Sequence, residues 1–239
     1  MLLTIVPTRG RPASVARLAQ AWRTTGAPEH ADLLLAADDD DPHLPAYRAA
    51  VEAEGEPWLR LETCGAWRPM VPKLNAVAVH HANSPAYTAL GFAGDDHVPR
   101  TPGWAAAYLA ELARLRVGIV HADDGRWHGS LPTEWAMSPA IIRRLGRMVP
   151  AGVEHLFCDN AVMELGRDAR CLTYLPGVLI EHMHPDVGKA ETDDGYAAVN
   201  SRERYANDER AFRRWRRYVR PRQVAAVRVL RAAAAGAAR

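Results

Sequence analysis

Two aspartates and a histidine follow an apolar run in the segment GFAGDDHVPRTPGW, residues 91–104. Burial beside a hydrophobic strand would cost free energy for the polar side chains of Asp95, Asp96 and His97, unless a cation lies close to them. A solvated turn is one interpretation of such an acidic pair, but Gly94 and the strand that delivers the acids favour a ligand site. Carboxylate oxygens suit Mg²⁺ or Mn²⁺, and a histidine ligand favours Mn²⁺.

A second source of metal ligands is the segment GVLIEHMHP, residues 177–185. On a strand, His182 and His184 share one face with Val178 and Ile180. A lone histidine on such a face is usually a core residue. Two in succession at the exit of a strand point to a metal ligand at one of the two positions.

Polar groups at three other places complete the candidates. Asp159 stands near the start of a predicted helix at 155–166, where an aspartate also complements the helix dipole. The acidic run at 38–41 follows a predicted strand, so it is either a solvated loop or a hydrogen-bonding partner for a nucleobase or ribose. Lys73 beside Asn75 could reach a phosphate. The chain has no Gly-rich P-loop and no GxGxxG, which argues against kinase-type and dinucleotide-type phosphate binding.

Predicted strands and helices alternate through the first half of the chain, which indicates a mostly parallel sheet. In such sheets ligands bind beyond the carboxyl ends of the strands, where the PTRGRP, DDDDP and GDDH turns fall. The segments CLTYL and GVLIEHMH are predicted to be two strands around a Pro-Gly turn. Strands are expected at 2–6, 32–37, 58–62, 86–92, 117–122 and near 133–137, and helices at 14–22, 45–54, 71–82, 102–115, 138–146 and 155–166.

Composition indicates a soluble globular protein of one large or two small domains. The chain has 239 residues, 48% hydrophobic residues and a net charge of +2. Its three cysteines are an odd, unclustered set, which argues against a disulfide framework and fits a reducing cytoplasm. From this cysteine usage a cytoplasmic protein is expected. No window approaches the roughly 18–20 apolar residues that a membrane span requires.

The C-terminal part is predicted to be helical from about 200, interrupted at Pro221, with a frayed AAAAGAAR tail. Arginine crowds the segment 210–231. This predicts a solvated helical face or an oligomer contact, and alternatively a contact with DNA, an anionic membrane surface or a polyanionic acceptor.

Together, these segments resemble the GT-A fold glycosyltransferases, most closely the family 2 type, over residues 1–185. LLTIVPTRGRP resembles that family's opening strand and turn, and AYTALGFAGDDH resembles its strand and DxD motif. CDNAVMELGRDARCLTYLPGVLIEH resembles its ED motif and closing histidine. The resemblance implies an α/β GT-A fold with a mixed, mostly parallel sheet. It implies a domain over 1–199, with a nucleotide-binding half at about 1–100 and an acceptor half at about 101–199, and a helical extension over 200–239.

The resemblance also assigns roles to residues. Two departures from the family pattern are Gly94, where the first DxD aspartate often stands, and Cys158, which replaces the glutamate of the ED pair. The implied general base is Asp159, and His182 rather than His184 takes the additional metal position. The implied donor-binding residues are Pro7, Thr8, Arg9, Asp38, Asp39, Lys73, Asn75 and Asp95, and the implied metal ligands are Asp96, His97 and His182. The alternative is a DxH pattern, as in some GT-A enzymes, in which Asp95 rather than Asp96 pairs with His97.

The function that follows is a metal-dependent inverting glycosyltransferase. It would use Mn²⁺ or Mg²⁺ and move a sugar from a UDP- or GDP-linked donor to a hydroxyl of a glycan, nucleic acid or protein. Trp127 and Trp135 are core or lid residues, or else stack on an acceptor sugar. The alternatives are a metal-dependent phosphoester hydrolase or nucleotidyltransferase, and a GT-A binding module without catalysis.

Overall fold

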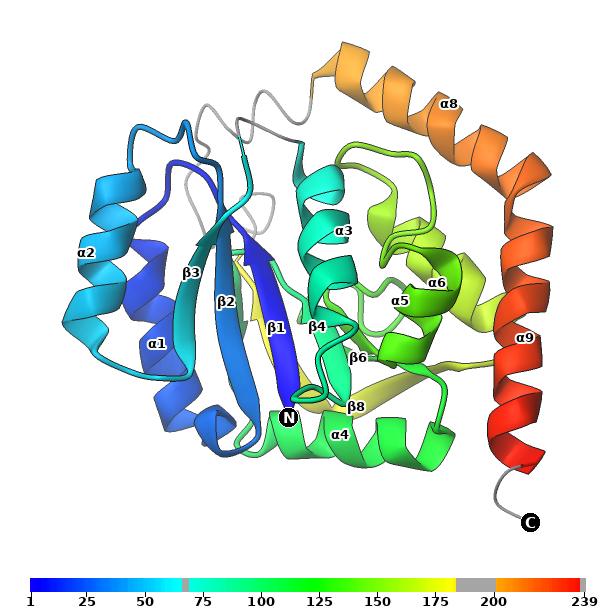
Figure 1. Ribbon diagram of the computed structural model, residues 1–239, viewed down its shortest axis with the longest axis horizontal. Helices are drawn as coiled ribbons and strands as arrows, with labels where there is room; N and C mark the ends of the chain where they lie inside the picture. The colour runs from blue at the N-terminus through cyan, green and yellow to red at the C-terminus, as the bar shows by residue number, and fades with distance from the viewer. Residues whose placement is uncertain (66–68, 184–200, 237–239) are drawn as a thin grey trace.

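A computed structural model describes residues 1–65, 69–183 and 201–236 as three layers, with a central sheet between two layers of helices (Figure 1). In this part of the chain, eight strands are ordered β3-β2-β1-β4-β7-β6-β8-β5. Neighbouring strands β1 to β4 pair in parallel, as do β6 and β8, whereas β7 and β5 pair antiparallel with their neighbours. The predicted mixed, mostly parallel α/β sheet is therefore confirmed. The strands are β1 Leu2–Pro7, β2 Ala31–Ala37, β3 Leu59–Thr63, β4 Ala89–Phe92, β5 His97–Pro99, β6 Ile119–Asp123, β7 Trp135–Met137 and β8 Leu172–His182.

Alternation along β1 builds a core on each face of the sheet. Leu2 and Val6 pack with α1 Ser14–Thr24, α2 Leu44–Glu54 and α4 Trp104–Leu115. Leu3 and Ile5 belong to the core on the other face. The helices of that second face are α3 Met70–His81, α5 Pro139–Leu145, α6 Cys158–Asp168, α8 Arg202–Tyr218 and α9 Arg220–Gly236.

The C-terminal helices α8 and α9 are part of this second core. Phe212 and Trp215 of α8 and Val227 of α9 are buried in it. Pro221 lies in the first turn of α9, where its missing N–H leaves no helical bond unmade. Helix α9 includes residues 232–236 of the AAAAGAAR segment, and the last three residues of the chain lie outside the described part.

Strand β8 differs from the sequence prediction. CLTYL and GVLIEH are not two strands around a turn, because β8 is one strand of 11 residues. The Pro-Gly pair falls where the register against β6 shifts, from Ala122 opposite Leu175 to Asp123 opposite Leu179. The pair is a bulge within a strand, because proline lacks the N–H that regular pairing needs. No helix in the described residues is both long and apolar enough to cross a membrane.

Candidate metal and catalytic site

The candidate residues gather at the carboxyl-end edge of the sheet. Thr8 follows β1, Asp38 follows β2, and Asp95 and Asp96 follow β4. These three strands are parallel neighbours, so their ends lie at one edge. The last residue of β8, His182, reaches the same place because β8 pairs antiparallel with β5, with His182 directly opposite His97.

Asp96, His97 and His182 form a cluster with the geometry of a metal site. Oδ1 of Asp96 lies 3.2 Å from Nδ1 of His97, and Oδ2 lies 3.4 Å from Nε2 of His182. One ligand atom from each residue falls within 4.8 Å of the other two, and the imidazoles stack at 4.1 Å. Neighbouring ligands of an octahedral ion are about 3 Å apart when each bond is about 2.1 Å. The donor set of one carboxylate and two imidazoles fits a divalent transition-metal ion such as Mn²⁺.

The charge of Asp96 agrees with this arrangement. Burial raises the pKa of the Asp96 carboxyl, but its contacts with His182 and His97 outweigh burial and hold that pKa well below the usual value. Asp96 is therefore a carboxylate at neutral pH, which is the state that binds a cation.

Gly94 makes room for the cluster. A Cβ at this position would lie 2.4 Å from Oδ1 of Asp96 and 2.8 Å from Nδ1 of His97. The backbone N–H of Gly94 also donates to Nδ1 of His97, over 3.0 Å. A side chain at 94 would push both candidate ligands away. The glycine that interrupts the DxD pattern is thus required by the way Asp96 and His97 fold back over the turn.

The adjacent residues Asp95 and Asp96 have different partners. Asp95 is buried, and its carboxylate accepts hydrogen bonds from Thr8 over 2.7 Å and from Arg11 over 3.0 Å. Its carbonyl accepts one from Arg17. Asp95 therefore fastens the turn after β1 to the turn after β4, while Asp96 faces the histidines.

Asp38 and Lys73 form a buried ion pair beside this turn. Nζ of Lys73 lies 2.8 Å from Oδ1 of Asp38 and donates to the carbonyl of Thr8 over 3.3 Å. Arg9 contacts the other oxygen of Asp38 at 3.1 Å. Asp38 has no exposed surface, whereas the side chain of Asp39 is exposed. Of the two aspartates, Asp39 is the one open to a ligand.

Asn75 holds a loop. Its Oδ1 accepts the N–H groups of Met148 and Val149, each over 2.8 Å, and its Nδ2 donates to the carbonyl of Val149. Both ends of the amide are therefore engaged with the backbone that follows α5, which fixes the start of the loop leading to α6.

Asp159 lies half-buried in the first turn of α6, near the cluster. Its Oδ1 accepts the N–H of Asn160 over 2.8 Å. Burial raises the pKa of Asp159, while hydrogen bonding to the backbone N–H of Asn160 and, less strongly, the charge of His182 lower it, and burial prevails. A half-buried carboxyl with a raised pKa is suited to accept a proton. The neighbouring Cys158 is buried in the core, so it packs where the family pattern has a charged glutamate.

Three residues that the sequence analysis did not single out belong to this region. The carbonyl of Asp124 accepts the N–H of His182 over 3.0 Å, and its Oδ1 caps the loop that carries Trp127. Burial lowers the pKa of His155 to about 4, so its imidazole is neutral at neutral pH. Asp124 and Arg11 each follow a strand end, which is the signal that could have found them; His155 has none.

The structure also separates the two tryptophans named as sugar-stacking candidates. Trp135 is 1% exposed and belongs to the core, whereas Trp127 is 42% exposed and Arg126 covers part of its ring at 5.2 Å. His184 lies outside the described residues.

No protein-family profile and no curated protein sequence matches the chain. Solved structures, however, are similar to the chain in fold. The mannosyltransferase PcManGT from Pyrobaculum calidifontis, in complex with GDP-Man and Mn²⁺, has a TM-score of 0.62 at 17% identity, over 100% of this chain and 75% of that one. TarS 1-349 from S. aureus has a TM-score of 0.57 at 10% identity, over 75% of this chain and 60% of that one. The same TarS fragment in complex with UDP-GlcNAc gives 0.55 at 12% identity, over 83% and 64%.

These likenesses confirm the GT-A-like glycosyltransferase fold that the sequence motifs imply. The chain spans about 60% of the length of the TarS fragment, so it matches part of that protein.

Proposed function

We propose that this protein is a metal-dependent inverting glycosyltransferase that moves a sugar from a nucleotide-sugar to a hydroxyl acceptor. The observation that carries the proposal is the cluster of Asp96, His97 and His182 at the sheet edge, with the carboxyl of Asp159 nearby. The likeness in fold to a mannosyltransferase bound to GDP-Man and Mn²⁺, and to TarS bound to UDP-GlcNAc, supports a nucleotide-sugar as the donor.

In this proposal Asp96, His97 and His182 hold a divalent ion, Mn²⁺ or Mg²⁺. Such an ion supplies positive charge that offsets the negative charge building on the leaving nucleoside diphosphate. The turns after β1 and β2 bind the nucleotide. Asp39 is the exposed carboxylate available to the base or ribose, and Asp38, fully buried between Arg9 and Lys73, keeps that turn in place.

Asp159 acts as the general base. Its half-buried carboxyl accepts the proton of the acceptor hydroxyl as the oxygen attacks the anomeric carbon. Attack from the face opposite the leaving group inverts the configuration in a single displacement. Positioned base catalysis of this kind contributes roughly 10²–10⁴-fold to a rate.

Metal binding is tested by calorimetric titration with Mn²⁺. We expect binding by the wild type, none by His182→Ala, and wild-type binding by the control His80→Ala on the exposed face of α3. Thermal stabilisation by a panel of UDP- and GDP-sugars in the presence of Mn²⁺ then identifies the donor. A blank across all donors would favour a binding module without catalysis.

The base is tested with Asp159→Asn. We expect donor-induced stabilisation to persist, and donor turnover to an acceptor or to water to fall at least about 100-fold. Asp168→Asn, at the far end of α6, is the control and should keep full turnover. Turnover that survives in Asp159→Asn would show that another group is the base. Hydrolysis of simple phosphoesters by the wild type, without sugar transfer, would favour a hydrolase.

A further inference from the structure

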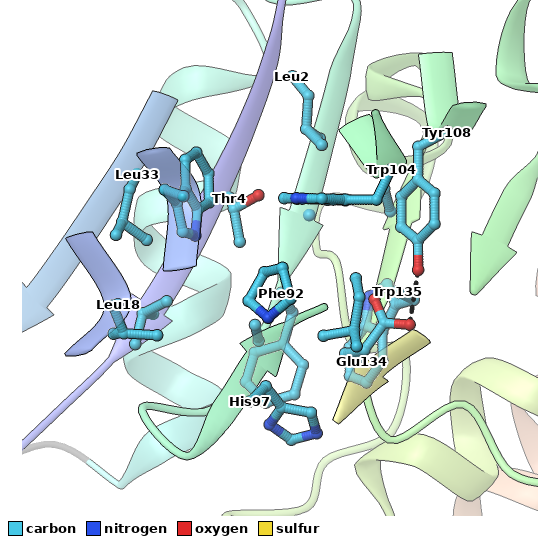
Figure 2. Close-up of a pocket in the computed structure, with 17 residues that line it drawn as sticks. Leu2, Thr4, Leu18, Leu33, Phe92, His97, Trp104, Tyr108, Glu134 and Trp135 are labelled. Atoms are coloured by element: carbon cyan, nitrogen blue, oxygen red, sulfur yellow. Dashed lines mark hydrogen bonds between the residues drawn. The ribbon is translucent and has the colours of Figure 1, made fainter. Parts of the chain in front are cut away.

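The pocket that the sheet closes against the helices α1 and α4 is too small for a substrate. It has a volume of about 20 Å³ and mostly apolar walls, among them Leu2, Leu18 and Phe92 (Figure 2). A volume of this size is room for about one water molecule. The feature that the proposed function leaves unused lies on the surface instead, in the arginines of α8 and the start of α9.

Positive charge is concentrated in these two C-terminal helices. Residues 210–231 contain nine arginines and no acidic residue, whereas the full chain has a net charge of +2. The remainder of the chain is therefore acidic on balance. Such a division of charge along a chain indicates an anionic partner for the basic part.

Four of the nine arginines serve the fold. Arg216 and Arg220 contact the buried carboxylate of Glu164 in α6. Arg228 and Arg231 donate to backbone carbonyls at the end of the same helix. These contacts tie α8 and α9 to α6, so these four side chains are engaged within the protein.

Four others form an arginine stripe on the outer face of α8, made of Arg210, Arg213, Arg214 and Arg217. These positions fall on one face of a helix, opposite the buried Phe212 and Trp215, and all four side chains are exposed. Arg213 pairs with Glu209 over 2.8 Å on the surface, and Arg210 donates to the neutral amide of Asn207. Within the part of the chain that the structure describes, no carboxylate pairs with Arg210, Arg214 or Arg217.

Two apolar side chains stand at the C-terminal end of the arginine stripe. Tyr218 is 63% exposed and Val219 is 40% exposed, at the junction of α8 and α9. Tyr218 follows Arg214 by one helical turn, and the guanidinium of Arg217 lies 5.4 Å from its ring. Figure 1 shows this junction at a corner of the molecule. The corner thus exposes apolar side chains and unpaired cations together.

This combination fits a lipid surface better than a nucleic acid. A nucleic acid would use the arginine stripe through its phosphates but would leave Val219 in water. At an anionic membrane, apolar side chains enter the boundary between headgroups and acyl chains, and arginines keep their charge among the headgroups. A membrane therefore uses both parts of the corner.

We propose that the arginine stripe, together with Tyr218 and Val219, docks this protein on an anionic membrane surface. The inner side of α8 is held by Asp208, whose carboxylate accepts the backbone N–H groups of residues 154–156. In Figure 1, α8 lies at the end of the molecule toward which β1 and β2 run. Docking therefore leaves the sheet edge with the proposed metal site on the membrane side. The docking rests on this surface and not on the proposed function.

Cosedimentation with vesicles tests the docking. The wild type should bind vesicles of one part phosphatidylglycerol to two parts phosphatidylcholine, and pure phosphatidylcholine much more weakly. Each arginine near an anionic surface contributes a factor of about five in affinity, so the triple variant Arg210→Gln, Arg214→Gln and Arg217→Gln should bind about 100-fold more weakly. Its melting temperature should equal that of the wild type, because the three side chains are exposed and glutamine also favours a helix.

A matched control removes the same charge from exposed positions on other helices. It combines Arg48→Gln in α2, Arg114→Gln in α4 and Arg144→Gln in α5, and should bind vesicles as the wild type does. Raising the salt from about 0.1 M to about 1 M shortens the Debye length from about 10 Å to about 3 Å and should release most of the bound protein. Tyr218→Ala should weaken binding at both salt concentrations, because salt does not screen apolar contact.

Binding of the same proteins to a labelled DNA duplex distinguishes the two polyanions. A wild type that does not bind the anionic vesicles, or a triple variant that binds them as well as the wild type, would overturn the proposal. Duplex binding that the triple variant loses, without vesicle binding by the wild type, would assign the stripe to a nucleic acid. A protein that docks but neither binds Mn²⁺ nor turns over a donor would keep the docking surface and lose the proposed function.

Discussion

Asp208 of α8 connects the C-terminal helices to the loop that carries the proposed base. It is 2% exposed, and its carboxylate accepts three backbone N–H groups, from Glu154 over 2.7 Å, His155 over 3.0 Å and Leu156 over 2.8 Å. This loop runs directly into α6 and Asp159. We therefore expect Asp208→Ala to loosen the entrance to α6 as well as to destabilise the fold.

The magnitude follows from the three hydrogen bonds. Each hydrogen bond to a charged group contributes about 1.5–3 kcal/mol, and each orphaned buried N–H costs about 1–3 kcal/mol. Water can reach part of this loop, because Glu154 is exposed, so the lower end of the range applies. Asp208→Ala should lower the free energy of unfolding by about 3 kcal/mol, and Asp208→Asn, which keeps one accepting oxygen, by about half as much.

The assay is urea denaturation, with the slope of the transition compared between variants so that a change in midpoint reports stability. Glu209→Gln is the control, because this adjacent residue pairs with Arg213 on the exposed side of α8, and the loss of that surface pair should cost less than about 0.5 kcal/mol. A loss below about 1 kcal/mol for Asp208→Ala would refute the reasoning. It would mean that other contacts, such as the bond from the N–H of Val71 to the carbonyl of Glu154, hold the loop.

Two other predictions concern buried charge. Lys73→Met should lower the free energy of unfolding, measured by urea denaturation, by about 3 kcal/mol. The reason is that the buried Asp38 then keeps Arg9 as its remaining cationic contact among the pairs described above. The control Arg48→Met, at an exposed position, should have little effect. Unchanged stability of Lys73→Met would mean that Arg9 suffices. Burial raises the pKa of the Glu134 carboxyl to about 7, above its value in the unfolded chain. The protonated carboxyl therefore stabilises the folded state fully below about pH 4.5, and this stabilisation is lost as the pH rises through 7. The loss in the free energy of unfolding is at most about 3 kcal/mol. Glu134→Gln should remove this slope from a series of denaturation curves between pH 5 and pH 8, and a slope that persists would assign it to another group.

Local sequence patterns were sufficient for most of the fold. Apolar runs gave the buried strands, and helical periodicity gave the helices, because both signals arise within a few consecutive residues. The exceptions are the short strand β5, which the sequence analysis did not expect, and β8. A Pro-Gly pair usually marks a turn, and only pairing with β6 across the sheet turns it into a bulge within one strand. Likewise α6 begins at Cys158 rather than at 155.

For the site, the sequence was sufficient to name residue types and strand ends but not their partners. It left open whether Asp95 or Asp96 faces the cluster, because adjacent residues have the same spacing to any motif. Tertiary contacts separate them: Thr8 and Arg11 bind Asp95, while His97 and His182 contact Asp96.

The same holds for polar residues that look alike in the sequence. Lys73 and Asn75 are both polar residues on one helix, yet the first pairs with Asp38 and the second holds the backbone at Met148 and Val149. The sequence by itself determined most of the strands and helices and the set of side chains at the ends of the parallel strands. Only the tertiary structure decided which of those side chains bond to protein and which face a ligand, because partners such as Thr8 and Asp95, 87 residues apart, and Asn75 and Met148, 73 residues apart, meet only when the sheet is assembled.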